Sequence, residues 1–296
     1  MFDPDGPRVL KDFGDVLRPK DAEPPILGPA VRSAVHGWIQ EIRARGELSE
    51  VGVKPRKSCI LFGPPGTGKT TLAHHLSARL GMDMLRVRAD QLTGKYMGQA
   101  TQAIAKLFDA AENAPNPLIL FLDEIEGVGA SRDKLSGSGA DNERMMQMGV
   151  LLQRLERFDN GLLIGATNKQ GGLDDALWRR FDLHLSVDLP AGDEVFAIAK
   201  RYLEPFDLED GEIWSLADGL QGAAPALIRQ FCESLKRTHV LDGKAQRVRG
   251  MADVLEGLIA AVAPHPSYDK PPLWGHSGAR GDIVKAMRWP MVRGAA

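Results

Sequence analysis

Short runs rich in apolar residues alternate with amphipathic stretches over the first two thirds of the chain, and the run at 84–89 itself alternates between apolar and polar residues. Runs of this length, apolar at nearly every position, are typical of strands buried on both faces of a parallel sheet. The stretches between them carry apolar residues every three or four positions, which is the spacing of an amphipathic helix. This alternation predicts an α/β fold with a doubly wound parallel sheet of five strands. The predicted strands are residues 58–62, 84–89, 118–122, 162–166 and 183–187.

The pattern changes near residue 190, where the strand-like runs stop and only helical spacing remains. Helices are predicted at residues 195–203, 213–220, 226–241 and 251–262. We therefore expect a small all-helical domain after the sheet. The predicted organisation is an extended N-terminal arm (1–25), a large α/β domain (26–189), a small helical domain (190–263) and an irregular C-terminal tail (264–296).

Composition and charge narrow the class of protein further. Hydrophobic residues make up 43% of the chain and charged residues 26%, as in an ordinary globular protein, and the net charge of −2 gives no global basic field for nucleic acid. Cys59 and Cys232 are far apart in sequence, so a reducing compartment is a simpler interpretation than a disulfide framework. We find no leader pattern and no run of about 18 apolar residues, so we expect a cytoplasmic protein without a membrane span.

The first predicted strand leads directly into a segment with the pattern G-x-x-x-x-G-K-T. The glycines of this pattern let backbone N–H groups close around phosphates, and the N-terminus of the following helix adds partial positive charge. Lys69 is expected to reach the β- and γ-phosphates, and the Thr70 hydroxyl is expected to bind Mg²⁺. The predicted nucleotide-binding residues here are Gly63, Pro64, Pro65, Gly66, Thr67, Gly68, Lys69, Thr70 and Thr71.

Acidic and amide residues follow two other predicted strands. Asp123 and Glu124 come directly after the strand at 118–122, and Asn168 comes two residues after the strand at 162–166. Ligands of open parallel sheets lie at the carboxyl ends of the strands. Asp123 is therefore expected to hold Mg²⁺, directly or through water, and Glu124 to act as general base toward the attacking water. Asn168 could orient the same water, although asparagine is also common as a cap where a strand enters a loop.

Two adjacent arginines, Arg179 and Arg180, precede the fifth predicted strand. An arginine presented to the γ-phosphate of a neighbouring subunit would stabilise the charge that develops in phosphoryl transfer. Out of context, two such arginines would simply lie on the surface. Arg180, directly before Phe181 and Asp182, is the preferred candidate, and Arg179 is the second.

Together these segments resemble the AAA+ ATPases, and within them the AAA family proper. The glycine-rich segment matches the family's Walker A motif, residues 121–126 look like Walker B, 166–168 resemble sensor 1, and 176–182 look like the arginine-finger segment. The motifs occur in family order over about residues 26 to 262. The resemblance implies a P-loop NTPase fold and Mg²⁺-dependent ATP hydrolysis, with ATP and Mg²⁺ as the bound cofactors.

The resemblance also implies how such a protein would assemble. Family members form six-membered rings in which ATP lies between the sheet of one subunit and the arginine fingers of the next. The small helical domain then acts as a lid over the nucleotide. Gly222 and Ala223 resemble the start of the family's second sensor helix, which packs near the base. Arg229, one turn further on, could approach phosphate, although many members have no arginine there.

Residues 95–98 are similar to the family's first pore loop, so Lys95, Tyr96 and Met97 would line an axial channel. An aromatic side chain there could grip an extended polypeptide without demanding a sequence. The function that follows is an ATP-driven homo-hexameric motor that remodels, unfolds or disassembles a protein substrate, with a separately encoded protease or adaptor as a further partner.

Three other functions stay open at this point. A non-threading enzyme activator or assembly chaperone is the main alternative. A nucleic-acid motor is disfavoured by the net charge and the aromatic pore loop. A nucleotide-gated scaffold without hydrolysis is disfavoured because Lys69, Asp123, Glu124, Asn168 and Arg180 are all present.

Overall fold

The computed structural model describes residues 8–88, 92, 99–127, 139–266, 269–275, 277–292 and 294. The chain divides into two compact units. The first consists of Met1–Pro25, Pro29–Gly63 and Lys69–Val187, and the second of Ile26–Gly28, Pro64–Gly68 and Asp188–Ala296.

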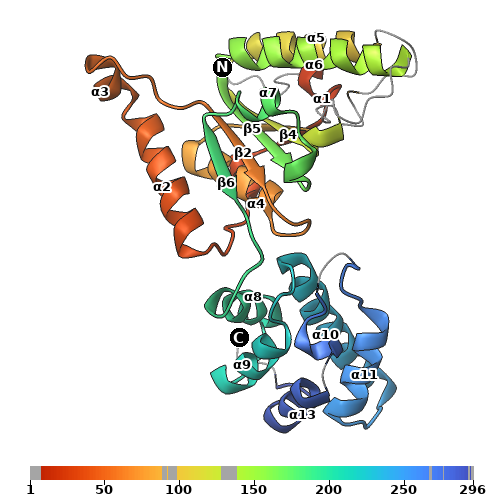
Figure 1. The fold of residues 1–296 in the computed structure, drawn as a ribbon. Coiled ribbons are helices and arrows are strands. Elements are labelled where there is room, and N and C mark those ends of the chain that lie inside the picture. Colours follow the sequence, from red (N-terminus) through yellow and green to blue (C-terminus); the bar gives the residue numbers. More distant parts are fainter. Residues whose placement is uncertain are drawn as a thin grey trace. The chain divides into compact units, whose positions relative to one another are not determined.

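The first unit is built on a six-stranded sheet (Figure 1). The strand order is β1-β3-β4-β5-β2-β6, and all neighbouring strands are parallel except β1 and β3. The interior strands are largely buried because their side chains are apolar toward both faces. The strands are β1 (Asp15–Leu17), β2 (Ser58–Phe62), β3 (Met84–Arg88), β4 (Leu118–Asp123), β5 (Gly161–Thr167) and β6 (Leu183–Ser186).

The predicted α/β fold is confirmed, but the prediction of five strands is wrong. The sixth strand, β1, comes from the N-terminal arm and pairs antiparallel with β3, so that Val16 lies opposite Leu85. An ion pair between Asp15 and Arg86 joins the same two strands. A strand of three residues is too short to produce a detectable alternation of apolar and polar positions, and for that reason the sequence did not reveal it.

Helices cover both faces of this sheet. Leu120 and Leu122 of β4 share one apolar cluster with residues of α5 and α6, so Ile119 and Phe121 point to the opposite face. On that opposite face α4 contacts β4 and β5. The helical segments of the unit are α1 (Arg8–Lys11), η1 (Pro19–Asp21), α2 (Pro29–Arg43), α3 (Arg45–Glu50), α4 (Lys69–Leu80), α5 (Gln99–Glu112), η3 (Ile125–Gly127), α6 (Gly139–Arg157), η5 (Gln170–Gly172) and α7 (Asp175–Trp178).

The described part of the second unit is helical. All four helices that the sequence predicted after residue 190 are present, with ends that differ by at most four residues. Leu216, Ile228 and Phe231 are fully buried in the core of this unit. The helices are α8 (Asp193–Leu203), α9 (Asp210–Gly219), α10 (Pro225–Ala245), α11 (Met251–Ala261), α12 (Pro272–Gly275) and α13 (Ser277–Ala286).

The C-terminal tail differs from the expectation of an irregular segment, because α12 and α13 lie within it. Leu273 and Ile283 belong to the core of the second unit, as do Met287 and Met291. Gly219 of α9 allows close packing here, since a Cβ on it would come within 2.9 Å of the Ile283 side chain. The apolar residues of the tail are too sparse to show a helical period, so tertiary packing rather than pattern defines these helices.

Both cysteines are buried and free, as expected for a chain without a disulfide framework. Burial raises the pKa of the Cys59 thiol and raises that of Cys232 to about 12, so neither is primed for reaction. Within the described residues, no helix combines the length and apolar character needed to cross a bilayer.

The start of β5 offers a test of the packing of the sheet. Gly161 has a φ of 135°, and a Cβ on it would lie 1.9 Å from the carbonyl oxygen of Leu118 on β4. Gly161→Ala is expected to lower the free energy of unfolding by more than about 1 kcal/mol, because backbone must move to accept the methyl group. Urea unfolding followed by circular dichroism measures the change.

Gly149→Ala in α6 is the matched control. No atom lies within 4 Å of a Cβ built on Gly149, and alanine favours the helix, so stability should stay the same or rise by up to about 1 kcal/mol. Equal effects of the two substitutions would contradict the proposed close approach of β4 and β5.

Candidate active site

Gly63 at the start of the glycine-rich segment, the acidic pair and Asn168 lie at the carboxyl edge of the sheet. Phe62 at the end of β2 is paired with Thr167 at the end of β5. Asp123 ends β4, which is the other neighbour of β5. Because β2, β5 and β4 are adjacent and parallel, Gly63, Asp123 and Asn168 all emerge at one edge, where ligands of such sheets bind.

The turn between β2 and α4 depends on glycine. Gly63 has a φ of 143°, and a Cβ on it would lie 2.3 Å from the carbonyl oxygen of Val187. Further along the turn, the Thr67 hydroxyl donates to the carbonyl oxygen of Pro64 at 3.0 Å. α4 begins at Lys69, so the free N–H groups of its first turn follow the glycine-rich segment directly. A phosphate group fits this arrangement of N–H groups at a helix N-terminus.

Lys69 and Thr70 connect this turn with the end of β4. Lys69 Nζ donates to the carbonyl oxygen of Gly63 at 2.9 Å, and the residue is only 7% exposed. Burial lowers the pKa of Lys69, while the carboxylates of Asp123 and Glu126 oppose this shift. Thr70 Oγ1 donates to Asp123 Oδ2 at 3.3 Å.

Asp123 is a half-buried carboxylate beside a hydroxyl group. Burial raises the pKa of Asp123, and the hydrogen bond from Thr70 and the charge of Arg86 act in the opposite direction. A hydroxyl and a carboxylate are hard oxygen donors, as Mg²⁺ requires. Two protein ligands suit Mg²⁺ because it usually keeps several waters and takes substrate phosphates as its remaining ligands. The donor set therefore fits the predicted metal.

Glu124 lies immediately after β4 in a left-handed backbone conformation, with a φ of 54°. Such a conformation costs a non-glycine residue about 1–2 kcal/mol, and backbone strain of this kind is concentrated at functional sites. The residue is exposed, so its carboxylate is accessible to water. This position is compatible with the predicted role of a general base.

Glu126 is a residue that the sequence reasoning did not single out. Its Oε1 accepts a hydrogen bond from the backbone N–H of Asn168 at 3.2 Å, which joins the end of β4 to the end of β5. Its Oε2 is buried and makes no hydrogen bond within the part of the chain that the structure describes. A second acidic residue two positions after Glu124 was the available signal, but only the fold reveals what it contacts.

The residues before α10 lie beside the glycine-rich turn within the second unit. The Ala226 N–H donates to the carbonyl oxygen of Gly66 at 3.2 Å. A Cβ on Gly66 would lie 3.2 Å from that of Ala226, so a larger residue at position 66 would crowd α10. Gly222 has a φ of 77°, and Ala223 is buried.

Arg229 and Thr71 are two further candidates from the sequence. Arg229 forms an ion pair with Glu233 on the same helix. Thr71 is exposed on the first turn of α4. The predicted pore residues Lys95, Tyr96 and Met97 lie outside the described residues.

Arg179 and Arg180 lie at the opposite edge of the sheet. They follow α7 and precede β6, which runs parallel to β2 and is paired with it from its first residue. Ser58, the first residue of β2, donates through its hydroxyl to the carbonyl oxygen of Arg180 at 3.3 Å. The Arg180 guanidinium forms an ion pair with Glu156 near the end of α6.

Asp182 anchors this arginine segment to the start of β2. Its Oδ2 accepts the N–H of Lys57 at 3.0 Å, and the N–H and hydroxyl of Ser58 at 3.1 and 2.8 Å. From Ser58 to Gly63 the chain rises by five residues of about 3.3 Å each, or about 16 Å. The arginine segment and the phosphate-binding turn are thus separated by the length of a buried strand.

Comparison with known proteins identifies the family of this chain. The family model "ATPase family associated with various cellular activities (AAA)" matches residues 59–189. An uncharacterized AAA family ATPase of Sinorhizobium fredii is 34% identical over 242 residues, which cover 81% of this chain and 72% of that protein.

Proteasome-activating nucleotidases are also similar to this chain. Those of Methanopyrus kandleri and Archaeoglobus fulgidus are 37% and 36% identical over 62% and 77% of the chain. The chain spans 43% and 61% of the lengths of these two proteins. The resemblance that the motifs indicated is confirmed, and the chain belongs to the AAA family of ATPases.

Proposed function

We propose that this protein hydrolyses ATP in a site shared between neighbouring subunits of a ring, and that it uses the reaction to remodel or unfold a protein. The observation that carries the shared site is the separation of Lys69 and Arg180 on opposite edges of one sheet. The buried strand between them is rigid, so Arg180 stays at the opposite end of β2 from Gly63 of its own chain. An arginine at that edge suits a nucleotide held by another subunit.

The carboxyl edge supplies the nucleophile and the phosphate contacts of the proposed reaction. Lys69 and the N–H groups of residues 63–68 would hold the phosphate oxygens of ATP. Mg²⁺, held by Thr70 and Asp123, would neutralise charge on the phosphates. Glu124 would remove a proton from the water that attacks the γ-phosphorus, which gives ADP and inorganic phosphate.

Two further groups complete the proposed site. Asn168 would orient the attacking water, and its backbone is fixed by the hydrogen bond to Glu126. Arg180 of the partner subunit, with Arg179 as the second candidate, would stabilise the charge that spreads over the γ-phosphoryl oxygens.

Both edges carry charged groups that could pair between subunits. Asp123, Glu124 and Glu126 lie at the carboxyl edge, whereas Arg179 and Arg180 lie at the amino edge. A head-to-tail contact between such edges is heterologous, and a heterologous contact closes into a ring when its rotation permits. We propose a hexamer, which is the assembly that the family resemblance implies.

The proposed substrate is a protein. Several relatives bear the name proteasome-activating nucleotidase, which supports a partner of the protease type for this chain as well. Tyr96 would grip the polypeptide in the axial channel. The two buried free thiols fit the cytoplasm, which is the compartment we propose.

Substitutions of Glu124 and Glu126 are expected to lower ATP turnover to different extents. Glu124→Gln should bind ATP normally and lower kcat by about 100-fold or more, because a general base is lost. Glu126→Ala should lower kcat by about tenfold and change KM for ATP by less than about twofold, because one hydrogen bond that positions Asn168 is lost. Steady-state release of phosphate measures both effects.

Glu126→Gln is the matched control, since its amide oxygen can still accept the Asn168 N–H. It should recover most of the wild-type kcat. If Glu126→Gln were as impaired as Glu126→Ala, charge rather than this hydrogen bond would be the contribution of Glu126. Wild-type turnover in Glu124→Gln would remove Glu124 as the base.

A substitution of Tyr96 tests whether ATP hydrolysis drives the threading of a polypeptide through the proposed channel. Tyr96→Ala should leave basal ATPase activity within about twofold of wild type and should abolish unfolding, because the aromatic grip is lost while the nucleotide site is intact. The assay is ATP-dependent loss of fluorescence from a fluorescent protein fused to an unstructured segment, and Tyr96→Phe is the control that should retain activity. Unfolding at the wild-type rate by Tyr96→Ala would favour the non-threading activator or assembly chaperone instead.

A further inference from the structure

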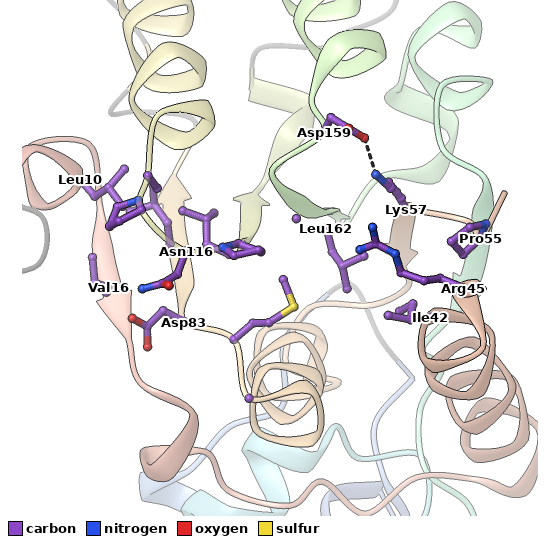
Figure 2. Close-up of a pocket in the computed structure, with 18 of the residues that line it drawn as sticks. Leu10, Val16, Ile42, Arg45, Pro55, Lys57, Asp83, Asn116, Asp159 and Leu162 are labelled. Carbon is purple, nitrogen blue, oxygen red and sulfur yellow. Dashed lines mark hydrogen bonds and ion pairs between the residues drawn. The ribbon is translucent and has the colours of Figure 1, made fainter. Parts of the chain in front are cut away.

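A cavity of about 560 Å³ opens at the amino edge of the sheet in the first unit (Figure 2). Its wall is made by the segments that lead into β2, β3, β4 and β5, together with parts of the N-terminal arm, α2 and α3. This volume lies within the range of sites that bind small molecules. The cavity is on the opposite edge from Lys69 and Asp123, so the proposed ATPase reaction leaves it unused.

Much of the lining is apolar. Val16, Ile42, Met82 and Leu162 contribute side chains from four different segments, and Pro55 and three residues at 115, 117 and 118 add to them. Figure 2 shows Ile42 and Pro55 on one side of the hollow and Val16 on the other. A ligand that fills this space therefore needs an apolar body.

The charged groups of the lining are paired, with one exception within the described residues. Asp83 pairs with Arg18, Arg56 pairs with Glu41, and Lys57 pairs with Asp159. Arg45 also lines the cavity, and the structure gives it no ion pair or hydrogen bond with any described residue. Its charge is near enough to help lower the pKa of Asp159, after the larger effects of Lys57.

In Figure 2 the Arg45 side chain extends from α3 toward the hollow, on the same side as Lys57. Asn116 and Asp83 lie on the other side of the view. An arginine with five N–H donors at one end of an apolar cavity matches a single carboxylate, sulfonate or phosphate group. The remaining lining charges compensate one another, so the lining residues offer no unpaired cation to a second ionised group on the ligand.

We propose that this cavity binds a small organic anion, which carries one acidic group for Arg45 and an apolar body for the space between Val16, Met82 and Leu162. The proposal does not depend on ATP hydrolysis, since all of its residues lie away from the phosphate-binding edge. The acidic group of the ligand is inferred from Arg45, and its apolar body is inferred from the apolar lining.

The test uses 1-anilinonaphthalene-8-sulfonate, a fluorescent probe with an aromatic body and one sulfonate, on the full chain without nucleotide. Wild type should show one saturable site. Arg45→Glu should weaken binding by about tenfold or more, because an attractive charge becomes repulsive, and Arg45→Lys should weaken it much less. Met82→Trp, which fills the cavity, should abolish binding.

Lys270→Glu is the control for net charge, since it makes the same change at an exposed position of the second unit. It should leave the affinity unchanged. Val16→Trp fills the cavity from another segment and replaces Met82→Trp if circular dichroism indicates that the latter does not fold. The proposal is overturned if binding is not saturable, if Lys270→Glu and Arg45→Glu weaken it equally, or if a folded cavity-filling variant binds like wild type.

Discussion

The proposed shared site depends on the hydrogen bonds that Asp182 accepts from Lys57 and Ser58. They attach the arginine segment to the start of β2, while the phosphate-binding turn follows the end of the same strand. Because β2 is buried and hydrogen-bonded on both sides, it keeps the proposed arginine finger apart from the glycine-rich turn of the same chain. Assembly of subunits would then be a condition for catalysis and not only a way to form a channel.

At the carboxyl edge, adjacent parallel strands bring polar residues from distant parts of the sequence close together. β4 and β5 deliver Asp123, Glu124 and Asn168 to one place, and Glu126 links the two strand ends through the Asn168 backbone. The left-handed backbone at Glu124 stores strain where the general base is expected. A change at the end of β4 would therefore move both Glu124, the proposed base, and Asn168, which is proposed to orient the water.

The strands with uninterrupted apolar runs could be predicted from sequence to within about a residue, because burial on both faces leaves no alternation to misread. The glycine-rich motif added the site residues at the end of β2. Three features needed the fold. β1 is too short to show a period, α13 is defined by the packing of Ile283 against Gly219, and the contact of Glu126 with Asn168 joins residues 42 positions apart. The motif around Arg180 predicted an arginine finger. The position of Arg180 at the amino edge of the sheet became clear only from the pairing of β6 with β2.

Complementation between two inactive variants tests the shared site most directly. Lys69→Ala lacks a group for ATP but retains Arg180, whereas Arg180→Ala retains the phosphate-binding edge. If neighbouring subunits share each site, each variant alone should be inactive, and an equal mixture assembled together should recover up to about a quarter of the wild-type ATPase activity, the fraction of interfaces with both halves intact. Full activity of Arg180→Ala alone, or a mixture no more active than its two components, would contradict a site shared between subunits.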